Sequence, residues 1–374
     1  MAVLTDKQRE AGWTVVKLGD IATVVTGQTP SKKFPEHWGE KGEIPFLTPK
    51  DQAIGIRLVD TERYISREYS DIYKKRIVPE GAVALTCIGS LGKISVVQTA
   101  TLTNQQINSI VPDGSKANNL YIYYYLMSSY DSLESLAGGT VMPIVNKSSL
   151  EGMEIPLPPL KEQERIAGIL GSLDDKIEAN TRLIQTIKEY MTALYKAEAK
   201  NGKVLELTDI ADFVNGRAFT KDATGTGRVV IRIAELNNGL GASTVYNDIE
   251  VKEENTAYPG DVLMSWSGSL DTYVWHLPEA IINQHIFKVI PKGNYPKWLV
   301  YHACKSVIED FQAIAVDKAT TMGHIRRGDL KRDISIPARE MPQMENLWNL
   351  WMNLEQENLQ LAETRDALIK RLIG

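Results

Sequence analysis

The hydrophobic positions along this chain form two kinds of stretch, and each kind occurs twice. Short apolar runs separated by Gly, Pro and Asn clusters predict β-strands in two regions of roughly 140 residues. Each region also contains a shorter helical pattern, around residues 120–127 and 298–308, and a long helical pattern follows it. The clearest strand patterns lie at residues 44–47, 82–87, 229–233 and 261–266. The pattern therefore predicts two small, β-rich α+β domains, each followed by a long helix.

The same short sequences recur in the same order in both halves, which indicates an internal repeat. Leu18–Ala22, which ends five residues before Gly27, returns as Leu207–Ala211 before Gly216. The other matched blocks are Gly81–Leu91 with Gly260–Leu270, Asn104-Gln105 with Asn283-Gln284, Thr140 with Thr321, and Ile155-Pro156 with Ile336-Pro337. We predict domains at residues 1–158 and 201–339, with helices at 159–200 and 340–374.

The first long helix has a heptad pattern over four heptads, which is typical of a coiled-coil seam. Asn180 fills its one polar gap, where a polar residue commonly fixes the register. The seam residues are Ile166, Leu170, Leu173, Ile177, Asn180, Ile184, Ile187, Met191 and Leu194. The second helix repeats this apolar stripe, the row of seam residues along one face, less regularly. Glu357 and Thr364 interrupt the apolar residues Leu347, Leu350, Trp351, Leu354, Leu361 and Leu368.

Neither long helix can bury its stripe alone. One solution pairs the two helices of the chain antiparallel, with a domain at each end, which gives the chain a pseudo-two-fold repeat. The alternative is that each helix packs on its own domain.

Composition excludes several classes of protein. No stretch approaches eighteen uncharged apolar residues, so we expect no membrane span. Cys87 and Cys304 are the only cysteines and the N-terminus has no secretory pattern, so we expect a reducing cytoplasm. Residues 1–158 carry 16 Lys and Arg against 17 Asp and Glu, and residues 200–339 carry 17 of each. Binding to a polyanion would therefore depend on local basic patches.

No catalytic motif is complete. The segment Gly89–Ile94 resembles a phosphate loop but has two residues between its glycines instead of four, and Ile where Ser or Thr should follow the Lys. The histidines show no metal-ligand spacing, and no methyltransferase tetrapeptide of the Asn/Asp-Pro-Pro-aromatic kind occurs. We therefore predict a chain that catalyses nothing, binds no metal and holds no cofactor.

The opening of the first long helix resembles a known family. The segment Leu157–Ile166 (LPPLKEQERI), followed by Leu173–Ile177 (LDDKI), is similar to the helix-opening signature of specificity subunits of type I restriction–modification enzymes. Trp13 and Leu18–Ala22 resemble the opening of a target-recognition domain of that family. The resemblance covers nearly the whole chain, although Ile336–Gln343 (IPAREMPQ) keeps only the Ile-Pro of the signature.

This resemblance implies two target-recognition domains held apart by an antiparallel coiled coil, each reading one half of a split sequence in double-stranded DNA. It implies no catalytic site in the chain. Two modification subunits would bring S-adenosylmethionine and methylate adenine. Two restriction subunits would bring ATP and Mg for translocation and cleavage. The residues leave two alternatives open: a specificity chain that serves a fused nuclease–methyltransferase, and a free-standing enzyme whose site the sequence does not reveal.

Residues in equivalent loops of the two copies are candidates for contacting DNA. Gly89-Ser90 and Gly268-Ser269 would let the backbone approach a phosphate. Asn104, Gln105, Asn283 and Gln284 suit adenine edges, although their occurrence in both copies also favours a structural role. We expect Lys147 and Arg326-Arg327, in one loop of each copy, to clamp phosphates.

Polar residues that differ between the copies are better candidates for base readout, because the two half-sites differ. Arg and Lys suit guanine in particular. These candidates are Lys32, Lys33, Thr48, Lys50 and Lys93 in the first domain, and Arg217, Lys221, Arg228, Arg232 and Ser267 in the second.

Overall fold

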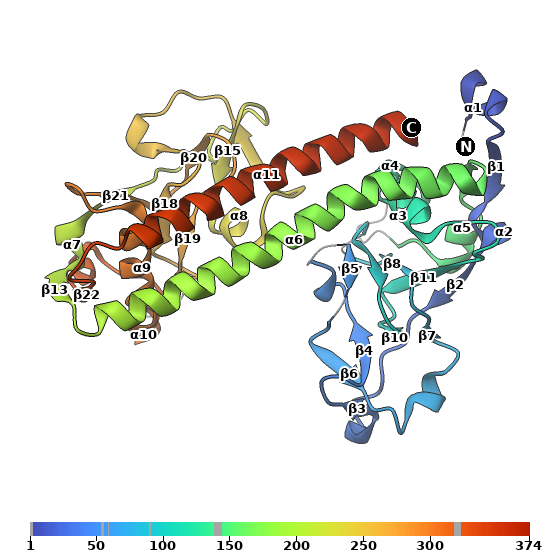
Figure 1. The fold of residues 1–374 in the computed structure, drawn as a ribbon, viewed down its shortest axis with the longest axis horizontal. Helices are drawn as coiled ribbons and strands as arrows, with labels where there is room; N and C mark the ends of the chain where they lie inside the picture. The colour runs from blue at the N-terminus through green and yellow to red at the C-terminus, as the bar shows by residue number, and fades with distance from the viewer. Residues whose placement is uncertain (1–2, 54–55, 59, 90, 138–143, 318–322) are drawn as a thin grey trace. The chain divides into compact units, whose positions relative to one another are not determined.

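The structure, a computed structural model, describes residues 3–53, 56–58, 60–89, 91–137, 144–317 and 323–374 (Figure 1). The chain forms two compact units. Unit 1 comprises Met1–Glu178 and Leu361–Gly374, and unit 2 comprises Ala179–Gln360. The division cuts both long helices, so it differs from the predicted linear order of domain, helix, domain, helix. Each unit contains one globular domain and a segment of each helix.

Unit 1 contains two five-stranded sheets and a two-stranded one, in the orders β2-β11-β8-β9-β5, β3-β6-β4-β10-β7 and β1-β12. Its strands are β1 (Thr14–Lys17), β2 (Ala22–Thr26), β3 (Trp38–Gly39), β4 (Ile44–Leu47), β5 (Arg57–Leu58), β6 (Arg63–Ile65), β7 (Ile77–Val78), β8 (Val83–Thr86), β9 (Ile94–Val97), β10 (Thr101–Thr103), β11 (Ile107–Pro112) and β12 (Glu154–Leu157). Its short helices are α1 (Asp6–Glu10), α2 (Leu18–Ile21), α3 (Asn119–Ser128), α4 (Tyr130–Leu136) and α5 (Lys147–Glu151).

Unit 2 contains sheets in the orders β14-β21-β18-β19, β16-β15-β20-β17 and β13-β22. Its strands are β13 (Lys203–Glu206), β14 (Ala211–Asn215), β15 (Arg228–Ile231), β16 (Val245–Asn247), β17 (Thr256–Ala257), β18 (Val262–Ser265), β19 (Thr272–Val274), β20 (Ala280–Ile282), β21 (Ile286–Pro291) and β22 (Asp333–Ile336). Its short helices are α7 (Leu207–Ile210), α8 (Ile233–Asn238), α9 (Lys297–Ser306) and α10 (Ile308–Asp317).

The strand pairings show that the internal repeat is a structural repeat. In unit 1, β10 lies parallel to β4, with Thr103 beside Leu47. In unit 2, β20 lies parallel to β15, with Ile282 beside Ile231. The pairs β2–β11 and β14–β21 are also equivalent antiparallel pairs. The two domains therefore share the central strand pairings, as the repeated sequence blocks predict, although among the described residues both larger sheets have five strands in unit 1 and four in unit 2.

Two equivalent glycines permit a close approach that any side chain would block. A Cβ on Gly27 would lie 2.0 Å from the carbonyl oxygen of Asn104. A Cβ on Gly216 would lie 2.1 Å from the carbonyl oxygen of Asn283. Backbone atoms cannot yield as a flexible side chain can, so glycine is required at both positions. This packing explains why the same spacing to glycine occurs in both halves.

The long helices are α6 (Leu160–Ala199) and α11 (Pro342–Leu372), close to the predicted bounds. In unit 2 their pairing is antiparallel, because Asn180 lies by Glu357 while Lys188, further along α6, lies by Glu355 and Trp351. The Nδ2 of Asn180 donates to Glu357 Oε2 at 2.8 Å and to Asn358 Oδ1 at 3.0 Å. The polar gap predicted in one helix therefore meets the polar interruption predicted in the other.

Most predicted seam residues are buried or half-buried, but Leu350 is 42% exposed, so its assignment to the seam is wrong. The first turns of α11 instead bury Met344, Trp348 and Trp351. Trp348 and Trp351 pack edge to face, and both contact Tyr301 of α9. The apolar face of α11 is therefore directed at the globular domain in these turns. Aromatic packing on the domain core has overridden the heptad spacing here.

The helices pack both on each other and on the domains, so the two arrangements considered from the sequence are combined. The core of unit 2 joins Ile184, Ile187 and Met191 of α6 to Trp348 of α11 and to the buried face of α9. The core of unit 1 joins Ile166 and Leu170 of α6 to Ile369 and Ile373 at the C-terminal end of the chain. Each domain therefore depends on both long helices for part of its core.

Candidate DNA interface

Four backbone hydrogen bonds gather the predicted recognition loops at one end of unit 1. The amide of Asn104 donates to the carbonyl of Leu47 at 2.9 Å, at the end of β4. Cys87 donates to Gln106 at 2.7 Å, Val145 donates to Cys87 at 3.0 Å, and Gln28 donates to Thr103 at 2.8 Å. We call this set of segments the first loop cluster: residues 28–29, 47–49, 87–89, 104–106 and 144–147.

The equivalent four hydrogen bonds form in unit 2. Asn283 donates to Ile231 at 3.1 Å, and Trp266 donates to His285 at 3.0 Å. Ile325 donates to Trp266 at 3.0 Å, and Arg217 donates to Ile282 at 3.4 Å. The second loop cluster comprises residues 217–219, 231–232, 266–269, 283–285 and 323–327. Since all eight bonds join backbone atoms, the side chains of these loops can differ between copies without loss of the framework.

Two of the four predicted amide residues are structural. Asn104 is 9% exposed, and its side chain accepts from the backbone of Gln106 at 2.9 Å and donates to the Gln106 side chain at 3.0 Å. Asn283 is 6% exposed and accepts from the backbone amide of Phe219 at 3.0 Å. Neither side chain is placed to meet a base edge, and the structural role considered from the repeat accounts for both.

The residue that follows each asparagine is exposed. Gln105 and Gln284 lie at the same place in the two clusters, with their side chains at the surface. Gln105 accepts a hydrogen bond from the hydroxyl of Thr29, which links two segments of the first cluster. Glutamine suits an adenine edge, so these two residues remain candidates for contacting a base.

The other candidate DNA-contacting residues of unit 1 differ in whether their side chains already bond to other protein groups. Thr48 donates through its hydroxyl to Asp51 at 2.6 Å, and Lys50 forms an ion pair with Glu62 at 2.8 Å. The ammonium group of Lys93 donates to the carbonyl of Pro49 at 3.0 Å, which fixes the turn after β8 against the end of β4. Lys32 and Lys33 are exposed in the loop after β2. Ser90 lies outside the described residues.

The glycines of the two small-residue turns adopt left-handed backbone, with φ of 79° at Gly89 and 68° at Gly268. Side chains other than Gly rarely adopt these angles, so both turns need glycine for their shape alone. Ser269 is exposed, whereas Ser267 is 6% exposed and forms an isolated β-bridge with His324. Ser269 is therefore accessible to a ligand, and Ser267 is not.

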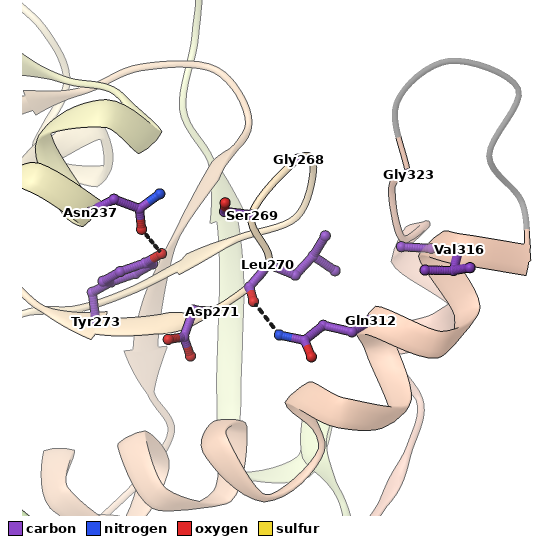
Figure 2. A pocket seen from close by; sticks show the side chains of 10 residues that line it. Asn237, Gly268, Ser269, Leu270, Asp271, Tyr273, Gln312, Val316 and Gly323 are labelled. Carbon is purple, nitrogen blue, oxygen red and sulfur yellow. Dashed lines mark hydrogen bonds between the residues drawn. The ribbon is translucent and has the colours of Figure 1, made fainter. Parts of the chain in front are cut away.

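Figure 2 shows a surface pocket of about 500 Å³ beside this turn of the second cluster. The residues that line it include Gly268, Ser269 and Gly323, together with Val316 of α10. The hydroxyl of Tyr273 donates to Asn237 Oδ1 at 2.6 Å, and the Gln312 side chain donates to the carbonyl of Leu270 at 3.0 Å (Figure 2). The pocket is thus open next to Ser269, with its wall held by local hydrogen bonds.

Arg232 is not available for base readout in the way its position suggested. Its guanidinium donates to both carboxylate oxygens of Glu235, at 3.0 and 2.6 Å, and to the carbonyl of Ser243 at 2.6 Å. Glu235 is 4% exposed, and its hydrogen bond raises the pKa of the guanidinium further. Three of the five N–H donors therefore hold the start of α8 and the loop before β16. We reassign Arg232 to the scaffold.

The guanidinium of Arg228 is likewise held by local hydrogen bonds, since it donates to Glu279 and to the carbonyl of Ile249. It begins β15, whose other end enters the second cluster, so it lies away from the cluster. By contrast, Arg217 and Lys221 are exposed on the segment that enters the cluster. They remain candidates for contacting DNA.

The predicted phosphate clamps lie after equivalent segments of the two domains. Arg326 and Arg327 are exposed beside Ile325, and the short 3-10 helix Arg327–Leu330 follows. Lys147 begins α5 and lies 3.5 Å from Glu151, one turn further along that helix. Thr140 and Thr321, which precede these residues in the sequence, lie outside the described residues.

Neither cysteine has the chemistry of a nucleophile. Burial raises the pKa of Cys87 to about 11 and that of Cys304 to about 12, so both thiols stay protonated at neutral pH. In the described part of the chain, no group of three or more His, Cys, Asp or Glu side chains could hold a metal ion. Likewise, none of the described helices is long and apolar enough to cross a bilayer.

Sequence reasoning missed one residue of interest, Arg63 of β6. No periodicity marks a strand of three residues, and a single Arg in a charged stretch gives no signal of its own. Its position becomes informative only when the strand pairing places it opposite Phe46 at the end of β4.

Two loop clusters on repeated α+β domains, joined by long antiparallel helices, define a two-domain recognition protein. A family model described as the type I restriction modification DNA specificity domain matches residues 10–189 and 200–346. The chain therefore belongs to the family of DNA specificity subunits of type I restriction–modification systems. The resemblance noted at the start of the first long helix is confirmed.

Individual relatives agree with this assignment. The specificity subunit of the type I restriction enzyme MjaIX from Methanocaldococcus jannaschii is 34% identical over 412 residues, covering 96% of this chain and 92% of that subunit. The EcoR124I/EcoR124II specificity subunit of Escherichia coli is 32% identical over 180 residues, covering 46% of this chain and 43% of that subunit. The crystal structure of an S subunit from M. genitalium has the same fold, with a TM-score of 0.55 at 17% identity and coverage of 97% and 96%.

Proposed function

We propose that this chain reads a bipartite target in double-stranded DNA, with one half-site bound by each loop cluster. The observation that carries the proposal is the framework of four equivalent backbone hydrogen bonds in each unit, on which the exposed side chains differ. A shared framework with different side chains suits two related domains that each read a different short sequence. The chain itself would perform no chemistry.

The reaction would then belong to partner subunits. Two modification subunits would use S-adenosylmethionine to methylate adenine, and two restriction subunits would use ATP and Mg to translocate and cut DNA. Relatives named as type I specificity subunits support this division of labour. The site of action would be the cytoplasm, because the target is DNA inside the cell.

A methyl-transfer assay tests the division of labour directly. We expect purified chain alone to transfer no methyl groups to DNA, and the chain with a modification subunit to methylate adenines within one split motif. DNA sequencing that detects methylated adenine would identify that motif. Methyl transfer by the chain alone would instead support the free-standing enzyme considered from the sequence.

The charge balance predicts how DNA binding depends on salt. Affinity through phosphate contacts falls with a log–log slope of about −0.9 per neutralised phosphate. Because neither globular domain has a basic excess, we expect the isolated chain to bind DNA weakly and the complex with modification subunits to bind tightly. In that complex, replacing Arg326 and Arg327 by Ala should weaken binding to all sequences alike and flatten the slope by roughly one to two units.

Titrations of cognate and scrambled duplexes at several salt concentrations would measure both effects. Lys203→Ala provides a matched control, because Lys203 is an exposed cation at the start of β13, outside the second loop cluster. A loss confined to the cognate duplex in the Arg326→Ala, Arg327→Ala double variant would make these residues base readers instead of phosphate contacts.

A further inference from the structure

Arg63 lies in the corner formed by two aromatic rings. Its guanidinium carbon is 4.7 Å from the centroid of Trp38 and 5.0 Å from that of Phe46. The two rings are 5.1 Å apart and nearly perpendicular, at 87°. Phe46 is fully buried, Trp38 is half-buried and Arg63 is exposed. The rings therefore hold a cationic group in a defined place at the surface of unit 1.

The Arg63 guanidinium differs from the cations around it in having no polar partner. Within the part of the chain that the structure describes, it makes no hydrogen bond or ion pair, and its contacts are the two rings. Lys41 pairs with Asp60 at 2.7 Å, Lys50 pairs with Glu62 at 2.8 Å, and Arg67 donates to the carbonyl of Gly42 at 3.2 Å. The neighbouring cations thus each have a polar partner, whereas all five N–H donors of Arg63 remain available.

Strand pairing ties Arg63 to the first loop cluster. Arg63 lies directly across from Phe46, and the next residue of β4 is Leu47, whose carbonyl accepts from Asn104. Asp51 reinforces the connection, since it accepts from the amides of both Thr48 and Glu62 at 2.8 and 3.0 Å. Trp38, Thr61, Glu62 and Arg63 line a surface pocket of about 420 Å³. Space for a ligand therefore lies beside the guanidinium.

The equivalent position in unit 2 holds an apolar residue. Phe46 pairs with Leu102 on one side and Arg63 on the other. Its counterpart Val230 pairs with Ile281 and Val245. Arg63 therefore corresponds to Val245, so one copy presents a guanidinium where the other presents an alkyl side chain. A residue needed for the shared framework would not differ in this way, whereas a residue that distinguishes two half-sites would.

We propose that Arg63 is a specificity-determining residue that reads a guanine in the half-site bound by unit 1; this inference rests on the proposed function. A guanidinium fits the O6 and N7 acceptors of guanine through two parallel hydrogen bonds. Stacking on Trp38 and Phe46 restricts the side chain before binding, which lowers the entropic cost of placing it against a base. The absence of a carboxylate partner leaves no ion pair to break.

The test measures discrimination between duplexes by the complex of this chain with its modification subunit. The panel consists of the cognate duplex and duplexes with one base pair changed at each position of the motif. We expect Arg63→Ala to reduce discrimination about 10- to 100-fold at one G·C pair, in the half of the motif read by unit 1. Discrimination at all other positions should be unchanged. Arg63→Gln, which keeps an aliphatic stem and a polar end but lacks the guanidinium, should lose discrimination at the same pair.

Arg67→Ala is the matched control, because Arg67 is an exposed Arg four residues further along and its guanidinium donates, among the described residues, to the carbonyl of Gly42. It should leave the motif unchanged. Equal weakening on every duplex would make Arg63 a phosphate contact, and unchanged affinity for every duplex would make it a structural side chain. Either result overturns the inference. Failure of the wild-type complex to distinguish cognate from scrambled DNA would instead overturn the proposed function.

Discussion

Replacing residues 13–155 with the equivalent segment of a relative should change one half of the methylated motif and leave the other half as it was. The backbone hydrogen bonds that assemble each loop cluster lie within one unit and involve no loop side chain. A foreign segment can therefore form its own cluster on the same framework. The donor should keep a tyrosine at the position of Tyr124, whose hydroxyl donates to Asp174 of α6 at 2.6 Å.

The reciprocal exchange of residues 203–335 is the control, and it should change only the other half of the motif. Methylated-base sequencing of DNA from cells that express each hybrid with one modification subunit measures both results. If either exchange altered both halves together, the two clusters would not read DNA independently.

The fold could be predicted largely because the sequence pattern of one domain and one long helix occurs twice in the chain. Blocks such as Leu18–Ala22 and Leu207–Ala211 recur at a nearly constant spacing, and the structure gives them equivalent helices, α2 and α7. Glycine spacing also carried real information, since Gly27 and Gly216 each permit the same backbone approach. The long helices followed from periodicity, because each must bury a continuous stripe.

The interface was harder to predict, because the availability of a polar side chain depends on its neighbours in space. Arg232 and Arg63 are both single arginines near strand ends, yet one is held by Glu235 and the other lies on two rings. The partner of Arg232 lies three residues away, at a spacing that could have been noticed. The partners of Arg63 lie on other strands, so only the pairing of β6 with β4 reveals them.

Removing the carboxylate of Asp174 should destabilise unit 1 by about 1–3 kcal/mol. Asp174 is 2% exposed and lies on α6, where it accepts from Arg365 of α11 at 2.7 Å and from Tyr124 of α3 at 2.6 Å. The Arg365 side chain is only 15% exposed. Asp174→Ala would leave Arg365 with only its second carboxylate partner, Asp366 at 2.8 Å, and would leave the Tyr124 hydroxyl without its acceptor; burial of unpaired polar groups is costly.

Asp175→Ala is a close control, because the neighbouring carboxylate is 57% exposed and pairs with Arg57 at the surface. Surface pairs contribute about 0–1 kcal/mol, so its effect should be small. Native-state hydrogen exchange would localise the effect: Asp174→Ala should speed exchange in α3 and the end of α11 while the strands of unit 2 keep their protection. Equal effects of the two variants would show that the buried cluster adds nothing to stability.

The division of the chain also has a consequence for folding during synthesis. Unit 2 is one continuous stretch, Ala179–Gln360, whereas unit 1 needs Leu361–Gly374 in addition to Met1–Glu178. Ile369 and Ile373 belong to the hydrophobic core of unit 1, although they are made after the whole of unit 2. Domains often fold in the order of their synthesis, N-terminal first. Here the ribosome must release the last turn of α11 before unit 1 can complete its core, so unit 1, whose first segment precedes unit 2, completes its core only after unit 2 has been made.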